Sequence, residues 1–148
     1  MIPELETYIY DTLQAQTGLT ALVSTRITNI YGSRSTLVCP YVVYQITEDQ
    51  ESDTMRGDGV TATIEFHIYD YAEGNTNNVS RQIIDQIRGD AATQSNKVPT
   101  YGLHRRIPGE MPSGWQISQI MRVGGTTAHE RDFLHYIETY RVTGSLGT

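Results

Sequence analysis

Four histidines are the side chains of this chain best able to hold a metal ion or to carry a proton: His67, His104, His129 and His135. None belongs to a His-x-x-x-His or His-Glu-x-x-His spacing, which would put two ligands on one face of a helix. His67 and His135 fall in separate expected strands. We therefore expect solvated or hydrogen-bonded histidines, with no metal and no cofactor. The alternative is a small metal-dependent enzyme in which these histidines converge with acids in a pocket.

The chain also lacks the spacings that mark common nucleophiles and phosphate-binding loops. It contains no Gly-x-Ser-x-Gly elbow, no phosphate-binding loop and no Gly-x-Gly-x-x-Gly. The single cysteine, Cys39, precedes Pro40 and has no patterned partner, which favours a small apolar packing role. A lone cysteine also excludes an intramolecular disulfide. We expect no enzymatic activity.

Segment 48–59 is the most acidic stretch, with Glu48, Asp49, Glu51, Asp53 and Asp58. These acids do not follow the ligand spacing of a calcium loop. Acids and glycines without an apolar period predict a long exposed connection, mobile in an isolated subunit and ordered by a partner. Asp53, Arg56 and Asp58 are its candidate contact residues.

A second candidate interface combines residue types that are enriched where proteins meet. Arg105 and Arg106 precede the loop 108–114, which carries Met111 and leads to Trp115. Tyr136 and Tyr140 in the last expected strand are further candidates. For each tyrosine, packing at the rim of the core is an equally good interpretation.

Length and charge limit the remaining classes. A chain of 148 residues fits one domain, 1–148, and 38% hydrophobic residues are enough for a folded core. A net charge of -6 opposes non-specific adhesion to nucleic acid or to an anionic membrane. The acidic N-terminus does not resemble a signal peptide, and no apolar run approaches the ~20 residues of a membrane span. We expect synthesis in a cytoplasm and no membrane partner.

The elements that must position these residues follow from apolar periodicity. Helical spacing predicts helices over 4–16 and 79–88, with a short helical turn near 19–23 between them. Alternation is clearest from Val60 to Ile68, whose even-numbered apolar residues should face the helices. Further strands are expected at 41–47, 101–107, 115–123 and 133–142. Gly124-Gly125 should end the strand 115–123. This order favours an α+β fold, a mainly antiparallel sheet with two principal helices on one face.

The order of these segments resembles the tail-completion or tail-terminator proteins of long-tailed bacteriophages. The likeness rests on the N-terminal helix, the run 40–45, the strand 61–69 leading into the helix at 79–87, and the aromatic C-terminal strand 132–142. The region 90–130 is longer than in that family. The resemblance implies a tail-terminator-like domain in a virion, at the junction of tail and head. It also implies a homo-oligomeric ring, usually a hexamer, between the tail tube protein and a head–tail connector or head-closure protein. DNA would pass through this ring without sequence-specific binding. A head-closure adaptor or a tail-tube subunit is the structural alternative.

Overall fold

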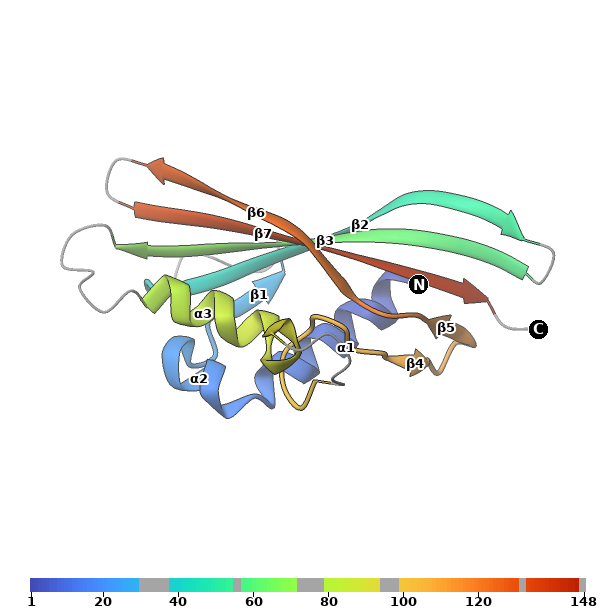
Figure 1. Ribbon diagram of the computed structural model, residues 1–148, viewed down its shortest axis with the longest axis horizontal. Coiled ribbons are helices and arrows are strands. Elements are labelled where there is room, and N and C mark those ends of the chain that lie inside the picture. Colours follow the sequence, from blue (N-terminus) through green and yellow to red (C-terminus); the bar gives the residue numbers. More distant parts are fainter. Residues whose placement is uncertain (30–37, 55–56, 72–78, 94–98, 131–132, 147–148) are drawn as a thin grey trace.

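The computed structural model describes residues 1–29, 38–54, 57–71, 79–93, 99–130 and 133–146 (Figure 1). The helical elements are α1 (Ile2–Gln14), α2 (Thr17–Val23), α3 (Val79–Arg88) and the 3-10 turn η1 (Asp90–Thr93). The strands are β1 (Ile27–Asn29), β2 (Tyr41–Thr54), β3 (Gly57–Tyr71), β4 (Gly109–Glu110), β5 (Trp115–Ile117), β6 (Met121–Glu130) and β7 (Phe133–Leu146). The α+β fold expected from the sequence is confirmed.

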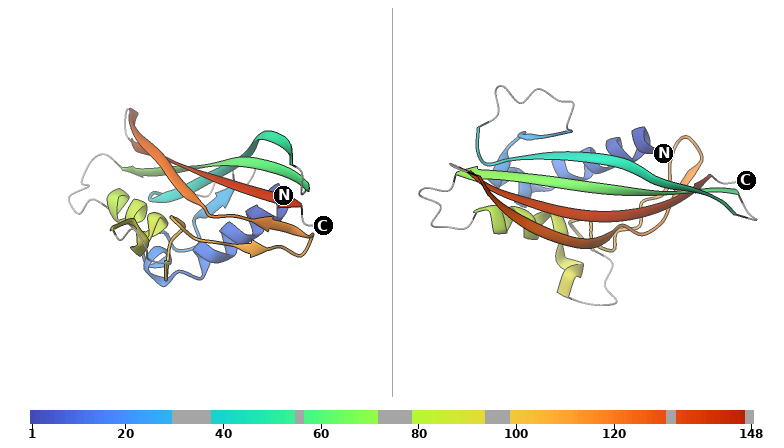
Figure 2. Two further views of the ribbon diagram at one scale, coloured as in Figure 1. Left: turned by 45° about the vertical axis from the view of Figure 1, so that its right-hand side comes forward. Right: turned by 90° about the horizontal axis from the view of Figure 1, so that it is seen from above.

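Three long strands form the centre of the sheet, whose order is β1-β2-β3-β7-β5-β4. The β3 strand pairs antiparallel with β2 on one side and with β7 on the other. Among the described strands, β1 alone runs parallel to its neighbour, β2. On the side away from β3, β7 pairs with β6 over residues 133–141 and with β5 over residues 144–146. The helices lie under one face of this sheet, and no helix of the described residues lies on the opposite face (Figures 1 and 2).

The core lies between the helices and that covered face. The even-numbered residues from Val60 to Ile68 are buried, as predicted, and Ile64 and Phe66 are wholly inaccessible. A shift of one residue would have buried Thr63, Glu65 and His67 instead, so burial of an apolar face selects this register. The helices bury apolar side chains at helical spacing against this face. These are Leu5, Ile9 and Leu13 of α1 and Ile83, Ile84 and Ile87 of α3.

Both expected helices are present. The helix predicted over 4–16 runs from Ile2 to Gln14, with Pro3 in its first turn, where a missing N–H leaves no hydrogen bond unmade. The helix predicted over 79–88 has those bounds in α3. The short turn near 19–23 is a helix of its own, α2, which begins after Gln16.

The prediction of a long connection at 48–59 is wrong. Strand β2 continues to Thr54 and β3 begins at Gly57, with one register shift between Glu48 and Gln50. Strand ladders are held by backbone hydrogen bonds, which do not depend on apolar side chains. The end of the β2–β3 hairpin projects beyond the helices in Figure 1, and its sequence has no apolar alternation that would have indicated a strand.

The region 101–123 also differs from expectation. Residues 101–107 form turns instead of a strand, because Gly102 and Arg105 adopt positive φ angles of 84° and 69°. The single strand predicted at 115–123 is divided into β5 and β6. Ile120 lies between them, with its backbone bonded to Arg105 and Arg106. Gly124 and Gly125 do not end a strand but pair with β7, and β7 itself extends to Leu146 beyond the predicted end at 142.

Candidate protein interface

The predicted interface residues separate into surface and core positions. Arg105 and Arg106 lie, half-buried, in the turn that follows Leu103. Trp115 and Tyr136 are partly buried and pack against the core. Asp53 and Asp58 are opposite each other at the end of the β2–β3 hairpin, while Arg56 lies outside the described residues.

Met111 and Tyr140 are core residues, which corrects their assignment to an interface. Tyr140 is wholly inaccessible, and its ring packs edge to face on Phe66 with centroids 5.6 Å apart. Met111 is 7% exposed and belongs to the same core. Both residue types are common in cores as well as interfaces, so their identity alone could not separate the two locations.

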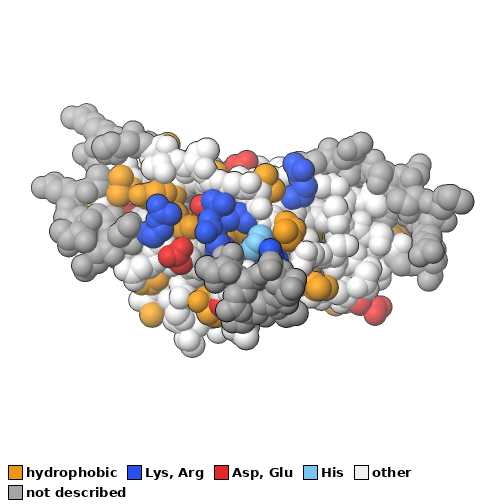
Figure 3. Space-filling model, in the orientation of Figure 1, with side chains coloured by type: hydrophobic (Ala, Val, Ile, Leu, Met, Phe, Trp, Pro, Cys, Tyr) orange, Lys and Arg blue, Asp and Glu red, His pale blue; other side chains and the backbone are white. Residues whose placement is uncertain are grey.

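Arg88, Arg105 and Arg122 surround His104, and we call these three residues the arginine cluster. They come from the end of α3, the turn at 103–106 and the start of β6. Hydrogen bonds join these segments: His104 N donates to the backbone O of Arg88 at 3.0 Å, and Arg122 N donates to the His104 side-chain Nδ1 at 3.1 Å. Figure 3 shows basic side chains gathered around a histidine in the middle of this face.

The lowered pKa of His104 shows that the surroundings of this side chain are positively charged. Burial lowers the pKa of His104, and the three neighbouring guanidinium groups of Arg105, Arg88 and Arg122 lower it further. The hydrogen bond that Nδ1 accepts also requires that nitrogen to be unprotonated. The side chain is therefore held neutral in a positive environment, although the whole chain has a net charge of -6.

One carboxylate neutralises part of the cluster. Glu138 of β7 is buried and accepts hydrogen bonds from Arg122 Nε at 2.5 Å and Nη2 at 3.2 Å. Arg88 Nε is buried and has no hydrogen-bond partner within the described residues. Glu138 thus pairs with one of the three arginines, Arg122.

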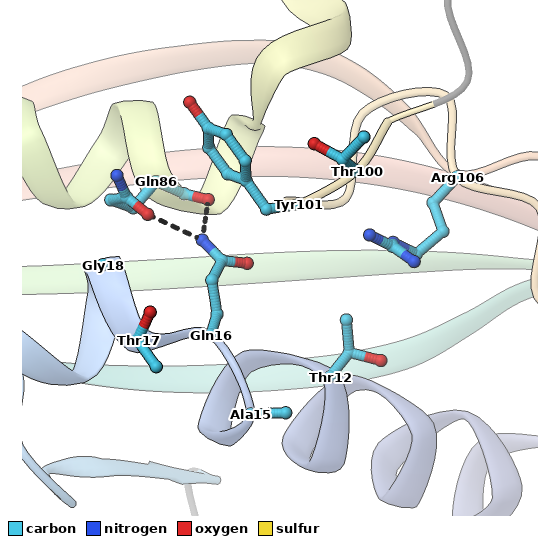
Figure 4. Close-up of a pocket in the computed structure, with 9 residues that line it drawn as sticks. All are labelled: Thr12, Ala15, Gln16, Thr17, Gly18, Gln86, Thr100, Tyr101 and Arg106. Atoms are coloured by element: carbon cyan, nitrogen blue, oxygen red, sulfur yellow. Dashed lines mark hydrogen bonds between the residues drawn. The ribbon is translucent and has the colours of Figure 1, made fainter.

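A polar cavity of about 590 Å³ opens between the α1–α2 junction, α3 and the turn at 100–106 (Figure 4). Gln16 organises it: its Nε2 donates to the backbone O of Gln86 at 2.6 Å and to Gln86 Oε1 at 3.0 Å, and its Oε1 accepts from Gly102 N at 3.0 Å. Arg106 Nε donates to Gly102 O at 2.7 Å, and its guanidinium points toward the cavity. The described lining residues include no His, Cys, Asp or Glu, and so no pair suited to acid–base catalysis.

The helix-free face of the sheet carries a row of aromatic and histidine rings. His67 Nδ1 lies 2.8 Å from His135 Nε2, and His67 Nε2 lies 3.1 Å from Glu65 Oε1. His135 stacks on Tyr69 at 4.2 Å, and Tyr69 stacks on Tyr41 at 5.0 Å. The prediction of hydrogen-bonded strand histidines is confirmed for His67 and His135.

The geometry offers no metal centre in the part of the chain that is described. No group of three or more His, Cys, Asp or Glu side chains there is arranged to hold an ion. His67 and His135 meet on the sheet face opposite the helices, while His104 lies among arginines, so the three do not converge. Among the described helices, none is long and apolar enough to cross a membrane.

Sequence reasoning found Arg105 but missed Arg88, His104 and Arg122 as members of one surface. Arg88 and Arg122 are separated by 33 intervening residues and belong to no motif. The available signal was the acidic exception Glu138 in an otherwise apolar face of the last strand, because a buried carboxylate requires a partner. Its partner was not readable from spacing.

No family model matches this chain, and no curated protein matches it. Among solved structures, a chain of the virion of native gene transfer agent (GTA) particle superposes on it with a TM-score of 0.67. The two chains share a fold. The match covers 97% of this chain and 96% of the virion chain, at 16% sequence identity. The likeness therefore includes both the helices and the sheet and extends to the longer region 90–130.

Proposed function

We propose that this protein is a structural virion protein that closes the head-proximal end of a tail tube and joins it to the head connector, without catalysis. The observation that carries the proposal is the fold shared with a chain of a virion particle over nearly the full length of both chains. The order of helices and strands resembles that of tail-terminator proteins, which supports a position at the end of the tube.

In this role the partners are further copies of the chain in a ring, six by resemblance, the tail tube protein on one side and the connector or head-closure protein on the other. A ring needs two different patches on each subunit, because heterologous contacts close only when one patch meets the other around an axis. DNA would pass through the opening. A net charge of -6 suits this passage, because it disfavours adhesion to phosphate.

Electron microscopy of particles from a producing strain tests the proposal. Disruption of the gene should leave heads and tails unjoined, and tails without a closing ring should vary in length, because an open tube end can add further subunits. Complementation with the intact gene is the control. Antibody labelling of complete particles should mark one position, where the tail meets the head.

Other labelling patterns would reject this position. Label along the whole tail would identify a tube subunit. Label confined to the head side, with tails of normal length after disruption, would identify a head-closure adaptor. Normal particles that contain none of this protein would reject a virion role altogether and restore the enzyme alternative.

A further inference from the structure

The polar cavity of about 590 Å³ is held in shape by hydrogen bonds and by a close backbone contact (Figure 4). The buried side chain of Gln16 binds Gln86 of α3 and the backbone N of Gly102. Gly102 lies so close to Gly89 that a methyl group on either residue would overlap the backbone of the other. The α1–α2 junction, α3 and the turn at 100–106 are therefore fixed together, and the cavity between them is already formed in the single chain.

Among the described residues that line this cavity, Arg106 alone is charged. Its Nε donates to Gly102 O at 2.7 Å, which fixes the plane of the guanidinium, and the group points toward the cavity. No carboxylate in the described part of the chain forms an ion pair with Arg106. Asp90 instead accepts from the N and Oγ1 of Thr100 at 2.9 and 2.6 Å. The terminal nitrogens of Arg106 therefore face the cavity without an acid.

The donors and the charge of the cavity define the group that fits it. The terminal N–H groups of one guanidinium match the two oxygens of a carboxylate, and its single positive charge balances one negative charge. A phosphate group carries about −1.5 to −2 charges and three acceptor oxygens, which a single arginine does not balance. The other polar groups of the lining are uncharged, among them Thr12, Thr17 and Gln86. The chemistry of the cavity therefore favours a carboxylate.

The lining favours a protein as the source of this carboxylate. Pockets for small molecules are walled mainly by apolar and aromatic side chains. Here the apolar side chains among the described lining residues are those of Ala15 and Tyr101. Tyrosine and arginine are the residue types that dominate binding energy where proteins meet, and Tyr101 and Arg106 belong to one turn, with Tyr101 39% exposed.

We propose that this cavity binds the carboxylate of an Asp or Glu side chain from a neighbouring subunit of the particle, with Arg106 as its partner. This inference rests on the proposed virion role, which supplies the neighbour, and it names the group that the neighbour presents. Two parallel hydrogen bonds from the guanidinium to the carboxylate would be directional as well as charge-assisted. Because Arg106 is held by the backbone of Gly102, the contact fixes the orientation of the neighbour on this subunit.

A titration of the purified full chain with acetyl-Glu-amide tests the chemistry of the cavity. The NMR signals of the Gly102 N–H and the Arg106 Nε–H should shift. The Kd should be at least about tenfold lower than for the uncharged acetyl-Gln-amide, because a charged acceptor strengthens the hydrogen bonds. Arg106→Gln should remove this preference. Arg141→Gln makes the same change at an exposed position of β7 that does not line the cavity, and it should keep the preference.

Carbodiimide coupling in complete particles tests the partner. Arg106→Lys places a primary amine at the cavity, and a carbodiimide joins such an amine to a carboxylate in contact with it. Lys97 is the only lysine of the chain, so Lys97→Arg in the same protein leaves no other lysine to react. Mass spectrometry of digested particles should find an amide between position 106 and an Asp or Glu of a neighbouring subunit. Particles that carry Lys97→Arg alone are the control and should lack this amide.

Several results would overturn the inference, and they are distinct from failure of the proposed function. Equal affinity for the two blocked residues, or tighter binding of inorganic phosphate than of acetyl-Glu-amide, would reject a carboxylate site; this titration uses the wild-type chain and does not depend on any variant folding. Particles that contain the Arg106→Lys protein but show no coupling, or coupling to a small acid or to the same chain, would reject the neighbour and leave the proposed function standing. Particles without this protein would reject both.

Discussion

The Arg122 guanidinium reaches diagonally across the β6–β7 pair to the carboxylate of Glu138, and Gly125 leaves the room for it. Gly125 is the β6 residue opposite Glu138, and a methyl group there would lie 2.5 Å from Glu138 Oε1 and 2.9 Å from Arg122 Nη2. The ion pair therefore occupies the space that a side chain on residue 125 would fill. This ion pair explains why an acid, Glu138, lies on the helix-covered face of β7.

Replacing Glu138 with Gln should lower the free energy of unfolding by about 1–3 kcal/mol, measured by urea denaturation. The loss leaves Arg122 unpaired beside two further arginines, but it falls below the ~3–5 kcal/mol of a fully buried pair. Arg122 keeps 27% of its side chain exposed, so water compensates in part. Glu110→Gln, at an exposed position, should leave stability unchanged. An equal midpoint for both variants would contradict a structural role for the ion pair.

Ile64→Asp should unfold the domain, because an unpaired charge at a wholly inaccessible position costs several kcal/mol against a total stability of ~5–15 kcal/mol. Thr61→Asp makes a similar change on the opposite face of the same strand, where the side chain is half-buried, and should remain folded. Circular dichroism and thermal melting of both proteins measure the difference. A soluble Ile64→Asp protein with wild-type melting would reject the register of β3.

Tyr140→Phe should leave stability unchanged or raise it by up to about 1 kcal/mol. Burial raises the pKa of the Tyr140 phenol strongly, and its hydroxyl has no hydrogen-bond partner within the described residues. Removing an unsatisfied buried hydroxyl relieves its desolvation cost, while the ring keeps its contact with Phe66. Thermal melting measures the effect. A loss above ~1 kcal/mol would show that the hydroxyl is bonded, for example to a buried water.

Gly102→Ala should destabilise the protein by several kcal/mol or prevent folding. Gly102 has a φ of 84°, and a methyl group there would overlap the backbone of Gly89, which it approaches closely. Gly124→Ala is the matched control, because a methyl group at that position meets nothing within 4 Å. Denaturation of the two alanine variants should separate them clearly. Similar midpoints would mean that the turn at 100–106 can move away from α3 without loss.

Stability should fall below about pH 6.5 in part through His104. Its pKa is lowered in the folded protein by burial and by three arginines, so the unfolded chain takes up this proton first as the pH decreases from the ordinary imidazole value of about 6.5. The contribution is fully present above that value and is lost as the pH falls toward the folded-state pKa.

His104→Asn, which keeps an acceptor for Arg122 N–H, removes this titration. The difference in unfolding free energy between the wild type and the variant should therefore change between pH 7.5 and pH 5. Urea denaturation across that range isolates His104 from the other three histidines, which both proteins share. A difference that stays constant with pH would contradict the lowered pKa.

Local periodicity was sufficient to predict the helices and the buried face of β3. Leu5, Ile9 and Leu13 repeat at helical spacing, and Val60 to Ile68 alternate, because each segment buries one face against the same core. The hairpin end at 48–58 escaped prediction because its pairing is made by the backbone beyond that core. The break between β5 and β6 escaped because Ile120 is buried between two strands, and a buried residue outside any strand leaves no periodic signal.

The sequence by itself determined the charge balance, the absence of catalytic spacings, the apolar faces and hence the α+β layer arrangement. Only the tertiary structure brought Arg88, Arg105 and Arg122 around His104, and only it placed Tyr140 and Met111 in the core. The physical reason is that periodicity reports burial within one element, whereas a surface cluster depends on how separate elements cross. Those crossings follow from the pairing of β6 with β7 and from backbone bonds between distant turns, which leave no pattern along the chain.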